Sequence, residues 1–353
     1  MTTQNRLKLG IAVAICGWAL AGQQLPAAII FTGNVEPSDP AQWKSYTDGY
    51  IGKTAYGKVQ VTGGSQLACY AGYLGYNSGV TGEVIVTDPG SKWTPSYLDI
   101  GYSGTGTLTI QQGGQVSSYS AYLAYNSGSQ GTVTVTGSGS QWSNSSSLYV
   151  GYRGTATLTI QQGGQLSSPT AYLGYYSGSQ GTVTVTGTGS QWTNSGDLYM
   201  GGAEWGGGAG AGTLTIQQGG QVSNRSGYLA YDSGSQATVT VSGAGSQWVN
   251  SQDLYIGYTG TATLTIQQGG QVSNRSGYLA YNSGSQATVT VSGAGSRWTN
   301  SANLYVGYKG TATLRVESGA VVEAKTIFAS FNDLLGNGTI QAKGAVVDTN
   351  VRF

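Results

Sequence analysis

Apolar and polar residues alternate with a period of two over short segments of the chain. In residues 132–135 and 263–266, threonines alternate with valine, leucine or isoleucine. Such alternation directs one set of side chains to each face of a β-strand. Gly-Gly and Ser-Gly pairs follow these segments at fixed offsets and are typical of turns. The pattern therefore predicts two or three short strands, joined by turns, in about every 25 residues.

The alternating segments recur at an almost constant distance. Their central apolar residues follow one another at steps of 25, 24, 25, 25, 25, 31, 25, 25, 25 and 25 residues, and these residues are Val59, Val84, Leu108, Val133, Leu158, Val183, Leu214, Val239, Leu264, Val289 and Leu314. The step of 31 contains a loop insertion near residues 203–208. The period predicts eleven coils of about 25 residues each.

Tryptophan marks every second coil, so that two related halves form a longer unit of about 50 residues. The intervening coils carry apolar or small residues at the same place. We expect each large ring to span two coils in the core or over a corner. The repeat-defining core residues are Trp93, Trp142, Trp192, Trp248 and Trp298.

A coil of this length cannot bury its own apolar edge, whereas stacked coils build one continuous core. The chain is therefore predicted to be all-β, a parallel β-helix (β-solenoid), and eleven coils spaced by roughly 4.8 Å give a rod about 50 Å long. We assign residues 57–316 to the solenoid repeats and residues 29–56 to an N-terminal cap region. Residues 317–353 form a degenerate coil or C-terminal cap.

The first 28 residues have the organisation of a secretory signal peptide. Arg6 and Lys8 precede an apolar run over residues 9–21, and Ala27 and Ala28 follow as the expected cleavage region. The run is about 13 residues long, short of the roughly 20 that span a membrane. We predict a secreted or cell-surface protein that meets a membrane only through its export signal. Cys69 is then the single cysteine, expected to be a buried packing thiol.

Composition narrows the chemistry. The 353 residues include 60 glycines, 15 lysines and arginines, 14 aspartates and glutamates, and no histidine. The lack of histidine argues against zinc sites and against Ser-His-Asp or Cys-His mechanisms. No basic cluster suggests a nucleic-acid partner. Asp197 and Asp253, at matching positions, are interpreted as exposed turn residues. We predict no catalytic site, no metal site and no cofactor, and hence no enzyme.

The low charge content follows from stacking, because a charge at a repeated position would face its own copies about 5 Å away. Arg225 and Arg275 are 50 residues apart, which places them two coils apart. A neutral asparagine follows four of the tryptophans by two residues, and these side chains are expected to form a hydrogen-bonded turn ladder: Asn144, Asn194, Asn250 and Asn300.

Two stripes of side chains are candidate binding surfaces. Outward threonines in Thr-x-Thr pairs, beginning with Thr107 and Thr109, predict a flat array that resembles ice-binding β-solenoids; its candidate residues are Thr132, Thr134, Thr157, Thr159, Thr182, Thr184, Thr213, Thr215, Thr238, Thr240, Thr263, Thr265, Thr288 and Thr290. Threonine is also simply a good outward strand residue. A tyrosine stripe offers rings for sugars or partner proteins, or for stacking on one another.

The units at residues 137–145 and 148–152 resemble the β-strand repeats of bacterial autotransporter passenger-type proteins, and residues 336–340 and 344–347 resemble the closing motif of such arrays. The resemblance implies a right-handed β-helix, secretion and an adhesin-like role. It does not include a C-terminal barrel, since about 40 residues follow the last clear repeat and even eight membrane strands need more.

The preferred hypothesis is a non-enzymatic secreted or cell-surface scaffold or adhesin-like module. Ice binding is the first alternative, and polysaccharide binding or cleavage is the second. The expected partners are surface glycans, the surface of a host or neighbouring cell, or further copies of the chain. Nucleic acid and metal ions are not expected.

Overall fold

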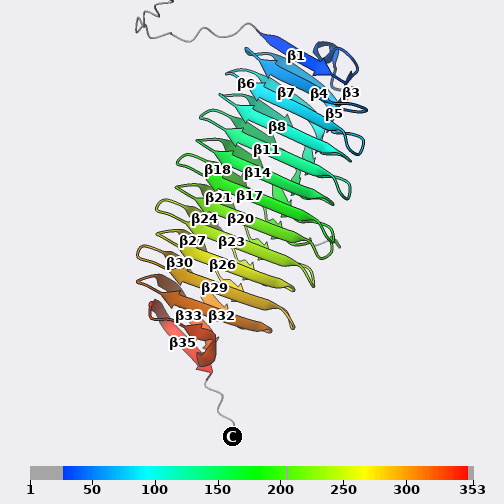
Figure 1. Cartoon of the computed structure of the whole chain (residues 1–353). Coiled ribbons are helices and arrows are strands. Elements are labelled where there is room, and N and C mark those ends of the chain that lie inside the picture. The colour runs from blue at the N-terminus through cyan, green and yellow to red at the C-terminus, as the bar shows by residue number, and fades with distance from the viewer. Residues whose placement is uncertain (1–26, 204–205, 349–353) are drawn as a thin grey trace, which may run out of the picture.

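The computed structural model describes residues 27–203 and 206–348. Successive strands lie one above another in an elongated body, with β1 at one end and β35 at the other (Figure 1). The predicted signal peptide lies almost wholly outside the described residues, and its last residue, Ala28, begins β1. The prediction of an all-β solenoid with eleven coils of about 25 residues is confirmed.

Each coil contributes one strand to a parallel sheet that we call the first face. Equivalent residues pair in register, so that Val133 lies between Leu108 and Leu158. Apart from the antiparallel strand β1, the strands of this face, in order, are β4 (Gly57–Thr62), β6 (Thr81–Thr87), β8 (Thr105–Gln111), β11 (Gln130–Thr136), β14 (Thr155–Gln161), β17 (Gln180–Thr186), β20 (Ala211–Gln217), β23 (Gln236–Ser242), β26 (Thr261–Gln267), β29 (Gln286–Ser292), β32 (Thr311–Glu317) and β34 (Leu334–Leu335).

The remaining strands of each coil form two further parallel ladders. The second face contains β9 (Gln115–Ser118), β12 (Gln141–Asn144), β15 (Gln165–Ser168), β18 (Gln191–Asn194), β21 (Gln221–Asn224), β24 (Gln247–Asn250), β27 (Gln271–Asn274) and β30 (Arg297–Asn300). The third face contains β3 (Asp48–Ile51), β10 (Ser120–Leu123), β13 (Ser147–Val150), β16 (Thr170–Leu173), β19 (Leu198–Met200), β22 (Gly227–Leu229), β25 (Leu254–Ile256), β28 (Gly277–Leu279) and β31 (Asn303–Val306). Four long strands run across both faces: β5 (Gln66–Leu74), β7 (Lys92–Ile100), β33 (Val321–Ser330) and β35 (Thr339–Asp348).

The two ends of the described solenoid are built differently. At the N-terminal end, β1 (Ala28–Gly33) pairs antiparallel with β4 and covers that edge, while β2 (Val35–Glu36) pairs with β3 and η1 (Pro40–Gln42) follows β2. At the other end, β35 (Thr339–Asp348) continues the parallel pairing on β33, after the single-turn helix η2 (Phe331–Asp333). Parallel pairing thus begins at β3, before the predicted start of the repeats at residue 57.

Tight corners join the faces. Gly151, which follows the third face, has a φ of 74°, and a Cβ there would lie 2.2 Å from the carbonyl oxygen of Gln180 in the next coil. Only glycine fits so close an approach. At the same corner of the preceding coil, the Ser129 hydroxyl donates to the Asn126 carbonyl at 2.6 Å and closes the turn before the first face.

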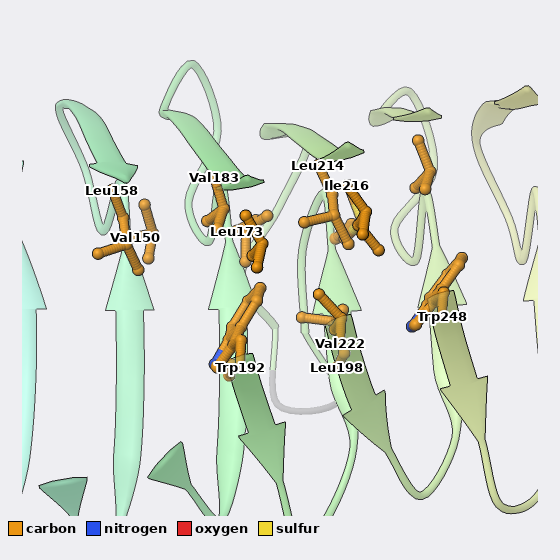
Figure 2. Packing of buried hydrophobic residues seen from close by; sticks show 14 of the residues in the cluster. Val150, Leu158, Leu173, Val183, Trp192, Leu198, Leu214, Ile216, Val222 and Trp248 are labelled. Carbon is orange, nitrogen blue, oxygen red and sulfur yellow. The ribbon is translucent and has the colours of Figure 1, made fainter. Parts of the chain in front are cut away.

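The core explains why the sequence repeats over two coils rather than one. Each repeat tryptophan is fully buried and pairs in register with leucine or valine of the coils on either side, as Trp248 does with Val222 and Val272. Trp192 and Trp248 point into the interior with the neighbouring aliphatic side chains (Figure 2). A Cβ on Gly227 in the preceding coil would lie 3.0 Å from the Trp248 ring. A tryptophan therefore needs a small residue in the coil before it.

The asparagines predicted to form a turn ladder instead point into the core, so that prediction is wrong. Asn250 is 3% exposed and ends a strand; its side chain accepts a hydrogen bond from the Asn224 amide at 2.6 Å. The side-chain oxygen Oδ1 of Asn224 in turn accepts a hydrogen bond from the Trp248 indole nitrogen at 2.7 Å. The same set recurs at Asn274, Asn300 and Trp298. These are separate buried groups rather than a continuous ladder, because every second coil carries tryptophan.

In an earlier unit of the chain, the buried tryptophan has no such hydrogen-bond acceptor for its indole nitrogen. Ser168 replaces asparagine beside Trp192, whose indole nitrogen has no hydrogen-bond partner among the described residues. The accompanying small residue is Ala171 there and Gly227 in the later unit. A Cβ on Gly227 would lie 2.8 Å from the Asn250 side-chain oxygen. Asparagine thus occurs with glycine in the later unit, and serine occurs with alanine in the earlier one.

Replacing Asn224 with serine should lower the free energy of unfolding by about 1–3 kcal/mol, because the buried Trp248 indole then loses its acceptor. The double variant Asn224→Ser/Gly227→Ala copies the arrangement around Trp192 and should recover part of that loss, since alanine costs less chain entropy than glycine. Urea unfolding followed by tryptophan fluorescence measures both. A double variant less stable than the single one would contradict the proposed pairing.

Candidate functional site

The threonines predicted as a binding surface all lie on the first face and point away from the core. Within each strand the intervening residues are buried, as Val133 and Val135 are on either side of Thr134. The in-register pairing places the threonines in two columns, one through Thr132 and one through Thr134. The columns run without interruption from β8 to β29, and a flat array of hydroxyl and methyl groups results.

Charged residues border the threonine array at both ends. At the N-terminal end, Thr107 pairs with Glu83, whose carboxylate binds Lys58 at 2.7 Å. At the C-terminal end, Thr290 pairs with Arg315, which lies 3.4 Å from Glu317. Between these two ion pairs the strands of the first face carry only neutral side chains. The threonine array is thus an uncharged surface about eight coils long.

The predicted tyrosine stripe consists of two columns of stacked rings. Along the third face, neighbouring centroids are 4.6–5.3 Å apart, and this column contains Tyr50, Tyr73, Tyr122, Tyr149, Tyr172, Tyr199, Tyr228, Tyr255, Tyr278, Tyr305 and Phe328. The corner column consists of two stacked runs, separated by the coil that has Gly201 and Gly202 at this corner. The first run contains Tyr76, Tyr102, Tyr125, Tyr152 and Tyr175, and the second contains Tyr231, Tyr258, Tyr281 and Tyr308. Rings of the two columns meet edge to face. Much of the surface of each ring is therefore covered by neighbouring rings. Burial raises the pKa of Tyr122 to about 12.

Asp99 interrupts the tyrosine column of the third face. It pairs in register with Tyr73 on one side and with Tyr122 on the other, in the position that tyrosine holds in neighbouring coils. Its side chain is 7% exposed, and its Oδ1 atom has no hydrogen-bond partner among the described residues. Desolvation raises the pKa of this carboxyl to about 7.

The prediction that Asp197 is an exposed turn residue is wrong. Asp197 is 5% exposed and accepts two hydrogen bonds from the Arg225 guanidinium, at 2.9 and 2.6 Å, and one from the Ser226 amide. Arg275 binds Asp253 in the same way. The arginines that the sequence placed two coils apart are therefore each neutralised by an aspartate of the preceding coil, and their repulsion is reduced further.

The second face carries a groove that the sequence analysis missed. Its outward side chains form a glutamine column and, two residues along each strand, a column of small or β-branched residues. The glutamine column contains Gln115, Gln141, Gln165, Gln191, Gln221, Gln247 and Gln271 and is bounded by Lys92 and Arg297. The second column contains Ser117, Ser143, Ser167, Thr193, Ser223, Val249, Ser273 and Thr299.

Three shallow hollows of about 160, 240 and 90 Å³ lie in this groove. The first two share Gln191 and Thr193 as lining residues, and the second and third share Gln247 and Val249, so the hollows join end to end. The recurrence of glutamine directly before a core residue in seven successive coils, as in Gln141-Trp142, was the sequence signal that marked this face.

Other chemistry is scarce in the described part of the chain. Across residues 27–203 and 206–348, no group of three or more histidine, cysteine, aspartate or glutamate side chains lies together to hold a metal ion. Cys69 is fully buried in the inward column that also holds Ser168 and Asn224, and burial raises the pKa of its thiol to about 12. No helix in the same residues is long and apolar enough to cross a membrane.

Comparison of the chain with protein-family models, with curated proteins and with solved structures found no match.

Replacing Asp99 with asparagine should remove a pH dependence of stability. The carboxyl ionises near 3.8 in the unfolded chain but near 7 when folded. The unfolded state therefore loses its proton first, and the free energy of unfolding falls as the pH rises from about 4 to about 7. A pKa difference of this size corresponds to at most about 4 kcal/mol. Urea unfolding at pH 4 and pH 8 measures it.

The Asp99→Asn variant and the parent chain should differ little at pH 4, and the variant should be the more stable at pH 8. The other carboxylates titrate alike in both chains and cancel in the comparison. An equal difference at the two pH values would show that Asp99 is not the titrating group.

Proposed function

We propose that the chain is an exported, non-enzymatic scaffold of adhesin-like type, related to the passenger repeats of bacterial autotransporters. The repeats would hold neutral side chains in fixed columns outside the cell. The partner would be a surface that itself repeats, such as the glycan coat of a neighbouring or host cell. The signal-peptide pattern of the first 28 residues supports export.

The single observation that carries this proposal is the register of the outward columns. Thr132 and its equivalents, Gln141 and its equivalents, and Tyr149 and its equivalents each recur once per coil with no lateral shift. A weak contact made by one coil is then repeated by the next at a spacing of about 4.8 Å. Affinity for a repeating surface would come from the number of simultaneous contacts.

The distribution of acids supports a non-enzymatic role. Asp197, Asp253, Glu83 and Glu36 are each held in an ion pair. Asp99 is buried, and no second ionisable side chain among the described residues is hydrogen-bonded to it. General acid and base work on a glycoside requires two carboxyl groups facing one bond. The Cys69 thiol, with its raised pKa, is a poor nucleophile.

The proposal is tested by shortening the rod in register. Deleting residues 239–288 joins Thr238 to Val289, which lies in the same column as Val239, and removes one two-coil unit. We expect the shortened chain to keep its strand-rich circular dichroism spectrum. Beads coated with it should adhere less strongly to a panel of bacterial and animal cells than beads coated with the full chain.

A full chain that is natively folded but adheres to none of these cells above albumin-coated beads would contradict the adhesin-like role. Equal adhesion by the full and shortened chains would contradict the contribution of repeated contacts.

Ice binding is the second candidate, and the uncharged threonine array on the first face favours it. Replacing Thr238 and Thr265 with tyrosine places bulky rings in the middle of that array. If the array binds ice, the parent chain inhibits ice recrystallisation and the double variant loses most of this activity. The matched control is Thr193→Tyr on the second face, which should leave the activity unchanged. Parent protein without inhibition rules this candidate out.

A further inference from the structure

We propose that the groove of the second face binds a neutral, extended, β-1,4-linked polysaccharide chain lying along the axis of the solenoid. The groove is defined by the glutamine column and the column of small or β-branched residues beside it. This assignment rests on the adhesin-like role proposed above and names the chemical class of the partner. It uses a different face from the threonine array.

The groove repeats every two coils. Each of the three hollows is centred on a coil that lacks tryptophan, at Leu166, Val222 and Val272. The outward residue of that coil in the second column is serine, whereas a larger β-branched side chain stands in the coil that follows. These serines are Ser167, Ser223 and Ser273, and the larger neighbours are Thr193, Val249 and Thr299.

The hollows share the two-coil spacing of the tryptophans, since each is centred on a coil that lacks tryptophan. Two coils correspond to about 9.6 Å. In an extended β-1,4-linked glycan successive sugars alternate in orientation, so its repeat is the disaccharide, whose length is close to this distance. A chain laid along the groove would place one disaccharide over each hollow and meet the same side chains at each step.

The side chains of the groove suit hydroxyl groups. A glutamine amide offers two donors and one acceptor oxygen, and serine and threonine hydroxyls offer both functions. Adjacent glutamines make only long contacts with one another, 3.4 Å between Gln141 and Gln165 and 3.5 Å between Gln191 and Gln221. Most of these exposed side chains are therefore available to a ligand.

The nearly uncharged lining of the groove disfavours nucleic acids and acidic glycans as ligands. The lining of the first two hollows contains no ionisable side chain, and Arg297 in the third lies at the end of the column and binds Glu323. Nucleic acids and acidic glycans require cationic neutralisation, which this groove does not offer. A neutral polyhydroxylated chain does not require it.

Exposed rings lie near the N-terminal end of the same face. Tyr70 and Tyr119 are 48% and 52% exposed at the corner after the second face, and Tyr97 lies between them with centroid distances of 5.5 and 5.8 Å. Sugars present apolar C–H faces that pack on such rings. A glycan chain that extends past Gln141 would reach this cluster.

Isothermal titration calorimetry on the full chain tests the inference with cellohexaose, xylohexaose and chitohexaose as β-1,4-linked probes. Maltohexaose has the same sugar as cellohexaose but is α-linked and coils, and oligogalacturonate is charged. We expect binding of at least one β-1,4-linked probe, at least tenfold weaker binding of maltohexaose, and none of oligogalacturonate. Native protein that binds none of the three β-1,4-linked probes would overturn the inference.

Filling the hollows locates the site. The variant Ser167→Val/Ser223→Val/Ser273→Val introduces a residue that this column already holds at Val249, so the fold should tolerate it. Its affinity should fall at least tenfold. The control Thr134→Val/Thr184→Val/Thr240→Val also removes three hydroxyl groups, on the first face, and its affinity should stay within twofold of the parent. Similar losses in both variants would refute the groove as the site.

The bead assay distinguishes failure of this inference from failure of the proposed adhesin-like role. Adhesion that persists in the filled-groove variant, together with an absence of glycan binding by the parent chain, would refute the groove assignment and leave the adhesin-like role standing. Glycan binding without adhesion to cells would do the reverse.

Discussion

The whole molecule depends on the parallel hydrogen-bonding of each coil to the next in strict register. Once strands are held about 4.8 Å apart with like residues opposite, each position of the repeat becomes a column. What a residue can be is then decided by whether its own copy can lie beside it. Aliphatic residues, threonine, glutamine and tyrosine satisfy this condition, since they pack, bond or stack with themselves. A charged residue is stabilised where an opposite charge lies in the adjacent coil, as with Asp197 and Arg225.

The core adds a second condition, which acts over two coils. The Trp248 ring lies against Gly227 of the coil before it, in space that a larger side chain there would need. The space that Gly227 leaves is filled by the Trp248 ring and by Asn250. The hollows are centred on coils without tryptophan, at Ser167, Ser223 and Ser273, although Ser143 in the coil of Trp142 also lines the first hollow. The buried tryptophans and the hollows on the surface thus both repeat every two coils.

Much of this could be predicted from the sequence, because a repeat of 25 residues with two-residue alternation allows few folds. The strand positions of Val59 to Leu314, the outward threonines and the buried tryptophans all follow from periodicity alone. What could not be predicted depends on contacts between non-equivalent positions. The Arg225 pair with Asp197 joins residues 28 apart, and the groove arises from the relative sizes of Ser223 and Val249, which no single-strand pattern reveals. Asn250 looked like a turn residue because polar side chains usually end strands at the surface.

The pairing of tryptophan with a small residue one coil earlier also governs how such a chain can lengthen or shorten over evolutionary time. Gain or loss of a single coil would bring two tryptophan coils together, or two small-residue coils, and leave either a clash or a void. Recombination between repeats is therefore productive only when it moves whole units of about 50 residues. Under that rule the near-identity of residues 211–260 and 261–310 is the trace of a duplication that kept each tryptophan with its partner.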